Sequence, residues 1–209
     1  SATGLPQDSS SNNHHIDDFY CNDPVWTTDS KYGDYALEFD GSSSTCTGAE
    51  VNEEITSAPP TAMTAEAWIK LDDMDRWHAL FGYYNNGYFR FYVNSDNKLV
   101  LYVHGSSGTK SVVGSTELES GVWYHVAATY SETTNRIRVH LDGSVDGTTT
   151  LSSDYDMSDR GCCGTWVGYD NYWGYALDGI IDEDLKQNNQ PVEYREYENL
   201  SNKENESYL

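Results

Sequence analysis

The amino-acid sequence predicts an all-β fold, an antiparallel sandwich or barrel. Three observations lead to this prediction. From Tyr35 onward, short runs of residues follow one another in which apolar and polar side chains alternate with a period of two. Clusters of Asn, Asp, Gly and Ser separate these runs at intervals of about ten residues, a spacing typical of all-β domains. Helical periodicity is nearly absent from the same region.

Three segments show the two-residue period most clearly, and they cover residues 65–71, 89–94 and 136–141. In the second of them, Phe89 and Phe91 alternate with polar neighbours. Successive side chains of a strand point to opposite faces of the sheet. Each segment is therefore expected to place one face in a core and the other face outward.

Polar segments at 94–97, 132–135 and 142–143 separate such runs and predict hairpin turns. They contain Asn, Asp or Gly, which adopt the positive φ that tight hairpins require. The strands are therefore expected to form a meandering antiparallel sheet.

The composition divides the chain into three parts. Residues 1–29 are rich in Ser, Asn and Asp and lack a sustained period, so we predict an N-terminal extension there. Residues 30–187 form the predicted sandwich, and residues 188–209 form a polar C-terminal segment. Within that segment, residues 191–197 are expected to form a short helix with Pro191 in its first turn, followed by a solvated tail.

The charge excludes several classes of partner. The chain has 34 acidic and 12 basic residues among 209, a formal charge of −22. Nucleic acid is not an expected partner, because phosphate contacts require clustered Lys and Arg, and an anionic membrane surface is disfavoured likewise. No apolar stretch approaches the length of a membrane span, so no membrane insertion is expected.

The four cysteines are predicted to form disulfides. They do not form a Cys-x-x-Cys pair, and no His stands at zinc-finger spacing, so a metal site is poorly supported. A bond between adjacent Cys162 and Cys163 requires a strained ring. Two connectivities remain, and in both of them Cys21 and Cys46 are each linked to the loop of Cys162 and Cys163.

Several features predict a secreted protein at a cell surface or in the extracellular space. Disulfides form and persist in oxidising compartments. The chain begins Ser-Ala-Thr without Met or an apolar signal core, as expected of a mature form or of a trimmed chain. Two sequons, at Asn199 and Asn205, predict N-glycosylation. The acidic excess suits a salt-rich or calcium-rich exterior, where screening relieves self-repulsion.

Six segments together resemble the laminin-G-like members of the concanavalin A-like lectin/glucanase superfamily. They are, in chain order, residues 36–41, 64–70, 121–127, 138–143, 166–169 and 177–183. The resemblance extends over about residues 31–185. It implies a jelly-roll sandwich of two curved antiparallel sheets, usually secreted or displayed on surfaces. Such domains bind glycans or proteins and often contain a structural calcium ion.

The resemblance also implies a position for that calcium ion. Asp40 ends an early strand and Asp182 ends the last one, and the two would come together if those strands pair. Carboxylates are ligands that calcium prefers. The alternative is that Asp182 caps a turn and Asp40 only leads into Gly41.

Two turn-like segments, residues 83–88 and 169–175, concentrate aromatic rings with amides or carboxylates. This mixture of side chains suits a sugar ligand. The C–H faces of a sugar stack on aromatic side chains, and its hydroxyl groups hydrogen-bond to amides and carboxylates. The alternative is that these rings pack between subunits or on the rim of the domain. The predicted ligand-binding residues are Tyr84, Asn86, Tyr88, Asn171, Tyr172 and Trp173.

Catalysis is not expected. Retaining glycoside hydrolysis requires two carboxylates about 5 Å apart, and the Glu-x-Asp-x-(x)-Glu strand of the superfamily's hydrolases is missing. Residues 182–184 have the spacing for one acid pair, but Leu185 and Lys186 follow them. The sequence also lacks the Gly-x-Ser-x-Gly pattern of a serine nucleophile.

Two functional classes remain open. The first is an extracellular, non-catalytic binding or adhesion module that recognises a glycan or glycoprotein at a cell surface or matrix, with a structural calcium ion as its one candidate cofactor. The second is a structural subunit of an extracellular filament, pilus or coat that self-associates through its terminal segments. A glycoside hydrolase is the least favoured alternative.

Overall fold

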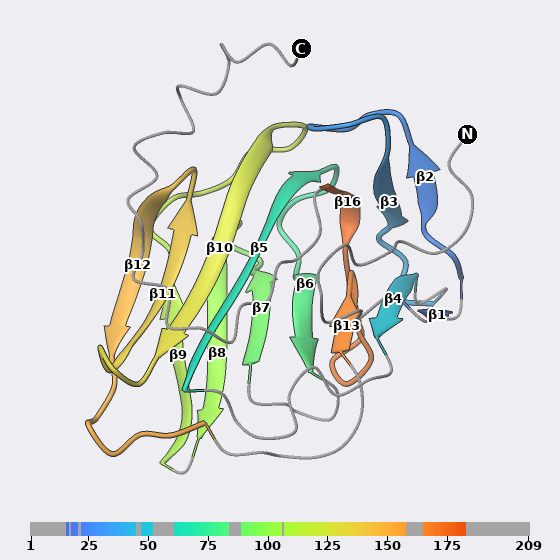
Figure 1. The fold of residues 1–209 in the computed structure, drawn as a ribbon. Coiled ribbons are helices and arrows are strands. Elements are labelled where there is room, and N and C mark those ends of the chain that lie inside the picture. Colours follow the sequence, from blue (N-terminus) through green and yellow to red (C-terminus); the bar gives the residue numbers. More distant parts are fainter. Residues whose placement is uncertain are drawn as a thin grey trace, which may run out of the picture.

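The computed structural model describes residues 16, 18–20, 22–44, 47–51, 61–83, 89–105, 107–157 and 165–182. Every regular element within these ranges is a β-strand. Two antiparallel seven-stranded sheets pack face to face, and a small two-stranded hairpin accompanies them (Figure 1). The described part of the chain thus contains no helix that could cross a membrane.

The first sheet presents the aromatic residues considered below. From one edge to the other it consists of β1 (Asp18–Tyr20), β4 (Gly48–Val51), β13 (Thr165–Val167), β6 (His78–Tyr83), β7 (Phe89–Val93), β8 (Leu99–Gly105) and β9 (Gly108–Val113).

The second sheet forms the other layer of the sandwich. Its order is β12 (Ser144–Thr150), β11 (Arg136–Leu141), β10 (Trp123–Ser131), β5 (Ala62–Leu71), β16 (Asp178–Asp182), β3 (Ala36–Asp40) and β2 (Val25–Thr27). The short strands β14 (Tyr169–Asp170) and β15 (Tyr175–Ala176) form the separate hairpin.

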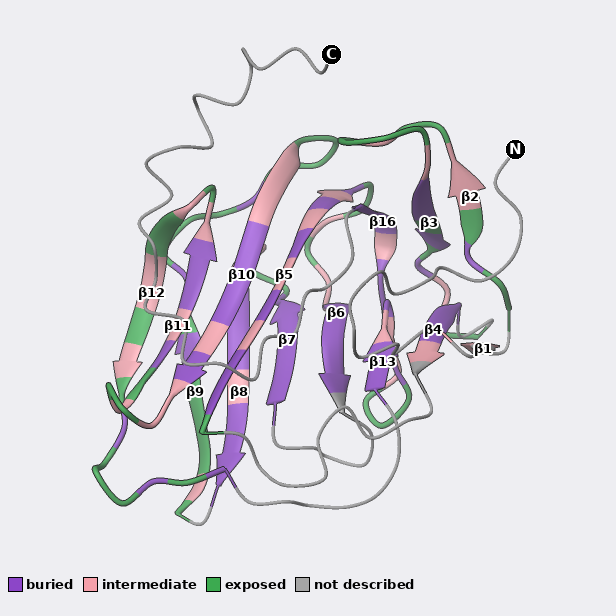
Figure 2. Ribbon diagram, viewed as in Figure 1, coloured by how far each residue is buried: buried purple, intermediate pink, exposed green. Residues whose placement is uncertain are grey.

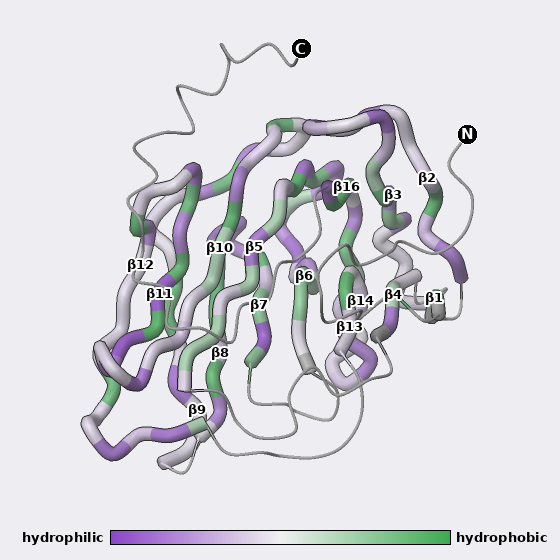
Figure 3. The backbone as a smooth tube through the Cα atoms, viewed as in Figure 1, coloured by the Kyte–Doolittle hydropathy of each residue, from purple (hydrophilic) through white to green (hydrophobic). Residues whose placement is uncertain are grey.

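The core lies between the two sheets and follows from the period of two. Phe89, Phe91 and Val93 of β7 are buried in it, while the residues between them point to the outer face of the first sheet. Burial likewise alternates along β5. Figure 2 shows β7 and β8 buried over most of their length and the edge strand β12 largely exposed, and Figure 3 shows the alternation of hydropathy along the strands.

The predicted strands and turns are confirmed. The alternating segments correspond to β5, β7 and β11. The hairpin turns contain Asn97, Asn135 and Asp142 at φ values of 60°, 51° and 47°. These left-handed conformations explain why Asn and Asp stand there, since their short polar side chains tolerate positive φ better than most residues do.

The segment predicted as an N-terminal extension contributes strands to both sheets. β1 pairs with β4 at the edge of the first sheet, and β2 pairs with β3 at the edge of the second. Each strand is only three residues long, which is too short to show a period. The last strand, β16, is not at an edge, because it lies between β5 and β3. The predicted helix at 191–197 lies outside the described residues.

Candidate functional site

A row of side chains crosses the outer face of the first sheet. The strand register aligns Trp166 of β13 with Gly82 of β6, Gly82 with Arg90 of β7, and Arg90 with Tyr102 of β8. These residues alternate with the core positions of their strands. Their side chains therefore lie on the face of the sheet that points away from the sandwich core.

Tyr92 is the centre of a ring cluster on this face. Its ring centroid lies 5.9 Å from Trp77, 6.2 Å from Tyr102, 5.6 Å from Trp166 and 5.9 Å from Tyr175. Three of the four contacts are edge-to-face, the arrangement that the quadrupoles of aromatic rings favour. Tyr92 and Trp166 are only 1% exposed, so the interior of the cluster is densely packed although it lies outside the main core.

Gly82 makes this packing possible. A Cβ atom at position 82 would stand 2.3 Å from Cζ2 of Trp166, far inside the van der Waals contact distance. The indole therefore lies directly against the backbone of β6. Any larger residue at Gly82 would push Trp166 away from Tyr92.

The β14–β15 hairpin packs against β6 at the side of this cluster. The chain leaves β13 through Gly168, which has a φ of 79° and would place a Cβ atom 2.2 Å from Cε1 of Phe39. Glycine meets both demands, since it has no Cβ atom and populates positive φ readily. The turn of the hairpin, residues 171–174, is thereby directed outward.

Asp170 holds the turn in place. Its side chain is buried, and its Oδ2 accepts a hydrogen bond of 2.5 Å from the hydroxyl of Tyr92. Its Oδ1 accepts hydrogen bonds from the backbone N–H groups of Tyr172 (2.8 Å) and Trp173 (3.4 Å). One carboxylate thus connects the ring cluster to the two residues at the tip of the turn.

The tip presents two large aromatic side chains to solvent. Tyr172 is 56% exposed and Trp173 is 54% exposed, and their rings meet edge-to-face at 5.0 Å. The ring of Trp173 is nearly parallel to that of Tyr175 at 6.4 Å, and the ring of Tyr175 to that of Trp77 at 5.1 Å. We call Trp77, Arg90, Tyr92, Tyr102, Trp166, Tyr172, Trp173 and Tyr175 the aromatic face.

The phenol groups of Tyr92 and Tyr175 stay protonated. Burial raises the pKa of the Tyr92 hydroxyl far above its ordinary value, and the negative charge of Asp170 acts in the same direction. Burial also raises the pKa of Tyr175, with Tyr102 and Asp170 contributing. These hydroxyl groups are therefore hydrogen-bond donors throughout the physiological pH range.

The structure brings together one of the two predicted aromatic segments. Asn171, Tyr172 and Trp173 are all exposed in the turn of the β14–β15 hairpin. Tyr84, Asn86 and Tyr88 lie outside the described residues, in the connection between β6 and β7. Their part in a binding site stays a prediction.

Sequence reasoning missed five residues on the strands and beside them, namely Trp77, Arg90, Tyr92, Tyr102 and Trp166. The available signal was their position. Tyr92 and Tyr102 occupy outward positions of β7 and β8, where a solvent-facing strand ordinarily has small polar or charged residues. Large rings at such positions indicate that the outer face is itself a packed or binding surface.

The predicted calcium pair is not brought together, and on this point the sequence analysis was wrong. β3 and β16 do pair, but in antiparallel register, with Asp40 opposite Asp178 and Leu37 opposite Ile181. Asp182 therefore lies four residues along the strand from the partner of Asp40, about 13 Å away. Ligands of one calcium ion lie about 2.5 Å from it, so Asp40 and Asp182 do not fit a shared site.

Each of the two carboxylates has a local partner instead. Oδ1 of Asp40 accepts hydrogen bonds from the Ser42 N–H (3.0 Å) and the Thr47 hydroxyl (2.9 Å). Oδ2 of Asp182 accepts hydrogen bonds from the N–H groups of Lys31 (2.5 Å) and Tyr32 (2.7 Å), as the turn-capping alternative expected. Within the described ranges, no three His, Cys, Asp or Glu side chains form a group that could hold a metal ion.

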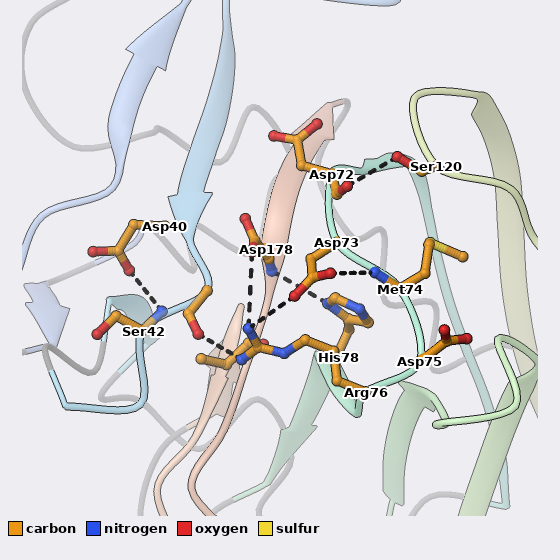
Figure 4. A network of polar contacts seen from close by, with 12 residues as sticks. Asp40, Ser42, Asp72, Asp73, Met74, Asp75, Arg76, His78, Ser120 and Asp178 are labelled. Carbon is orange, nitrogen blue, oxygen red and sulfur yellow. Dashed lines mark hydrogen bonds and ion pairs between the residues drawn. The ribbon is translucent and has the colours of Figure 1, made fainter.

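A guanidinium group lies among the acids near Asp40, as Figure 4 shows. Arg76 stands 3.8 Å from a carboxylate oxygen of Asp73 and 3.8 Å from one of Asp178. It also donates a 2.5 Å hydrogen bond to the carbonyl oxygen of Gly41. Burial raises the pKa of Asp178, and Arg76 opposes that shift. The positive charge at this end of the β3–β16 pair is thus supplied by the chain itself.

The remaining predictions concern the cysteines and the two sequons. Cys21, Cys46, Cys162 and Cys163 lie outside the described residues, as do Asn199 and Asn205. The disulfides and the glycosylation stay predictions.

Comparisons with solved structures agree with the fold. The CBM40 domain of a Ruminococcus gnavus sialidase, bound to α2,3-sialyllactose, is 15% identical with a TM-score of 0.58 over 74% of this chain and 89% of that one. Domain 4 of an extracellular arabinanase from Geobacillus stearothermophilus, in complex with arabinotriose, is 18% identical with a TM-score of 0.56 over 78% and 76%. A heptameric pentraxin from Limulus polyphemus is 20% identical with a TM-score of 0.57 over 76% and 77%.

Some matching structures are much longer than this chain. The chain covers 45% of a protein from Bacteroides ovatus and 45% of the binding domain of a paraclostridial mosquitocidal protein. No curated protein sequence matches it.

A family model described as the concanavalin A-like lectin/glucanases superfamily, of the laminin-G type, matches residues 27–184. Since this match spans more than half of the 209 residues, the chain belongs to the concanavalin A-like lectin/glucanase superfamily.

Proposed function

We propose that this domain is a non-catalytic glycan-binding module and that the aromatic face is its contact surface. The observation on which the proposal depends is the exposed pair Tyr172 and Trp173, held by the buried carboxylate of Asp170. Exposed aromatic side chains in a fixed position are typical of recognition sites.

The geometry suits a sugar ligand. A pyranose has apolar C–H faces that pack on an indole or phenol ring, and hydroxyl groups that pair with amides and phenols. Trp173 offers an exposed ring, and the exposed Asn171 offers an amide two residues away. The hydrogen bonds to Asp170 order the turn before any ligand arrives, which reduces the entropy lost on binding.

A non-catalytic role agrees with the state of the central acid. Asp170 accepts three hydrogen bonds from the turn and from Tyr92, and it is 1% exposed. An acid in such a position supports packing and is inaccessible to a glycosidic bond. The similar folds of the arabinotriose-bound and sialyllactose-bound domains support a sugar as the ligand. A secreted or cell-surface location is part of the same proposal.

A glycan array tests this function. The purified domain should bind one or more glycans, and Trp173→Ala should weaken that binding by about 1–3 kcal/mol, as truncation of an anchor residue does. Val145→Ala is the matched control, since Val145 is 53% exposed on β12, in the other sheet. The proposal fails if the domain binds no glycan, or if both variants bind as the natural sequence does.

Self-association is a second candidate, and the exposed sandwich edge favours it. The edge strands β9 and β12 lie side by side, joined by a 2.9 Å hydrogen bond from the Thr149 hydroxyl to the Ser111 carbonyl oxygen. Val113 and Val145 on these strands are 49% and 53% exposed. Exposed apolar side chains at such an edge can be covered by a second chain. Light scattering that shows polymers would support a structural subunit, and monomers at high concentration would contradict it.

A further inference from the structure

Arg90 lies within the aromatic face, and no acidic side chain of the described residues is paired with it. The residue is 6% exposed, and its buried Nε has no hydrogen-bond acceptor. The ion pairs of the described residues do not include it. The central carbon of its guanidinium group lies 5.7 Å from the ring centroid of Tyr102.

A buried guanidinium group in this state is unusual. Arginine stays charged at any pH that the protein meets, and it has five N–H donors in a planar fork. Buried charges in proteins are ordinarily paired or bound to a ligand. The nearby rings exclude water and lower the local dielectric, which strengthens the field of the cation at its exposed side.

Asp170 does not neutralise Arg90 by direct contact. Its Oδ2 is bonded to the Tyr92 hydroxyl and its Oδ1 to the turn of the hairpin. Asp170 raises the pKa of the phenols of Tyr92 and Tyr175, and Arg90 lowers it. The cation and the anion thus flank the ring cluster. Arg90 interacts with the Tyr92 hydroxyl, but within the described ranges no carboxylate is paired with its guanidinium group, so the group can still bind an acid.

We propose that the aromatic face prefers an acidic sugar and that Arg90 binds the acid group. The inference rests on the proposed glycan-binding function and adds the class of glycan. A sugar that stacks on the rings beside Arg90 would place a ring carboxylate or a sulfate ester against the guanidinium fork. Arginine pairs with such groups through two parallel hydrogen bonds.

The overall charge of the protein does not prevent this contact. The formal charge of −22 repels anions at long range, but at physiological ionic strength such repulsion is screened beyond about 8 Å. The preference therefore arises at contact distance. It should appear as slower dissociation of acidic ligands, with little gain in the association rate.

Titration calorimetry with matched ligands tests the proposal. The probes are galacturonic acid oligosaccharides, the same oligosaccharides as neutral methyl esters, and a sulfated galactan oligosaccharide with its neutral parent. The natural sequence should bind at least one acidic member about tenfold or more tightly than its neutral counterpart, the gain expected of a charge-assisted pair. The series that shows the gain identifies the acid as carboxylate or sulfate.

Three variants separate Arg90 from the rings. Arg90→Gln should reduce the affinity for the acidic ligand to that for its neutral counterpart, and Arg90→Lys should retain part of the preference. Trp173→Ala should weaken acidic and neutral ligands alike. Arg138→Gln, a matched loss of charge on β11 of the second sheet, should leave the preference intact.

The comparison of acid with ester uses the natural sequence, so it holds even if Arg90→Gln does not fold. Equal affinity for acidic and neutral ligands, with neutral binding intact, would overturn the inference and leave the glycan-binding function standing. Failure to bind any of these probes or any glycan on an array would overturn both.

Discussion

Replacing Asp170 with alanine should destabilise the domain strongly, because one buried carboxylate joins the ring cluster to the exposed turn. The variant loses the 2.5 Å bond from Tyr92 and two backbone bonds at 2.8 and 3.4 Å. Hydrogen bonds to charged groups contribute about 1.5–3 kcal/mol each, and a buried hydroxyl left without its acceptor costs about 1–3 kcal/mol. Since these terms overlap, we expect a total loss of about 3–4 kcal/mol.

Urea unfolding followed by tryptophan fluorescence measures this loss. Tyr92→Phe, which removes only the hydroxyl group, should cost about half as much. The two changes should be non-additive by about 1–2 kcal/mol in a double-mutant cycle, as expected of directly bonded groups. Asp34→Ala, a change at an exposed acid, is the control and should leave stability unchanged. A cost for Asp170→Ala below about 0.5 kcal/mol, or strict additivity with Tyr92→Phe, would refute the anchoring role.

Three further predictions concern pH, the acidic end of the β3–β16 pair and the cysteines. Burial lowers the pKa of His78 and of His140 from 6.5 to about 4, and Arg76 and Arg138 act in the same direction. Between these two pH values the unfolded chain binds more protons than the folded one. The free energy of unfolding is therefore complete above pH 6.5 and should fall by roughly 2 kcal/mol per histidine at pH 5. Unfolding curves of His78→Gln should show a flatter pH dependence, and an unchanged slope would contradict burial of the neutral ring. Arg76→Ala removes the cation 3.8 Å from both Asp73 and Asp178. The melting midpoint of this variant should therefore drop most at low salt and recover as salt is added. A drop that does not depend on salt would indicate lost packing instead. Non-reducing peptide mapping should link Cys21 and Cys46 each to the loop of Cys162 and Cys163, and four free thiols in the native protein would defeat that prediction.

The strands and turns were predictable because they depend on local chemistry. The period of two in β5, β7 and β11 follows directly from one buried face, and Asn97, Asn135 and Asp142 stand where positive φ is required. These signals are contained in a few neighbouring residues.

The site was only partly predictable, because it depends on register between distant segments. The sequence pattern indicates Tyr172 and Trp173, because they are rings in a predicted turn. Arg90 and Tyr102, by contrast, become neighbours only when β7 pairs with β8. The same cause explains the error over calcium. Antiparallel pairing places the end of β3 opposite the beginning of β16, so Asp40 faces Asp178 and Asp182 lies at the other end.

The central claim is that glycans bind on the aromatic face of the first sheet, and the indole N–H signals in a nitrogen–proton NMR spectrum test it most directly. Trp77 and Trp173 belong to this face, whereas Trp68 and Trp123 lie on the outer face of the second sheet. During titration with the best array ligand, the signals of Trp173 and Trp77 should shift together while those of Trp68 and Trp123 stay in place. Shifts confined to Trp68 and Trp123 would contradict the account.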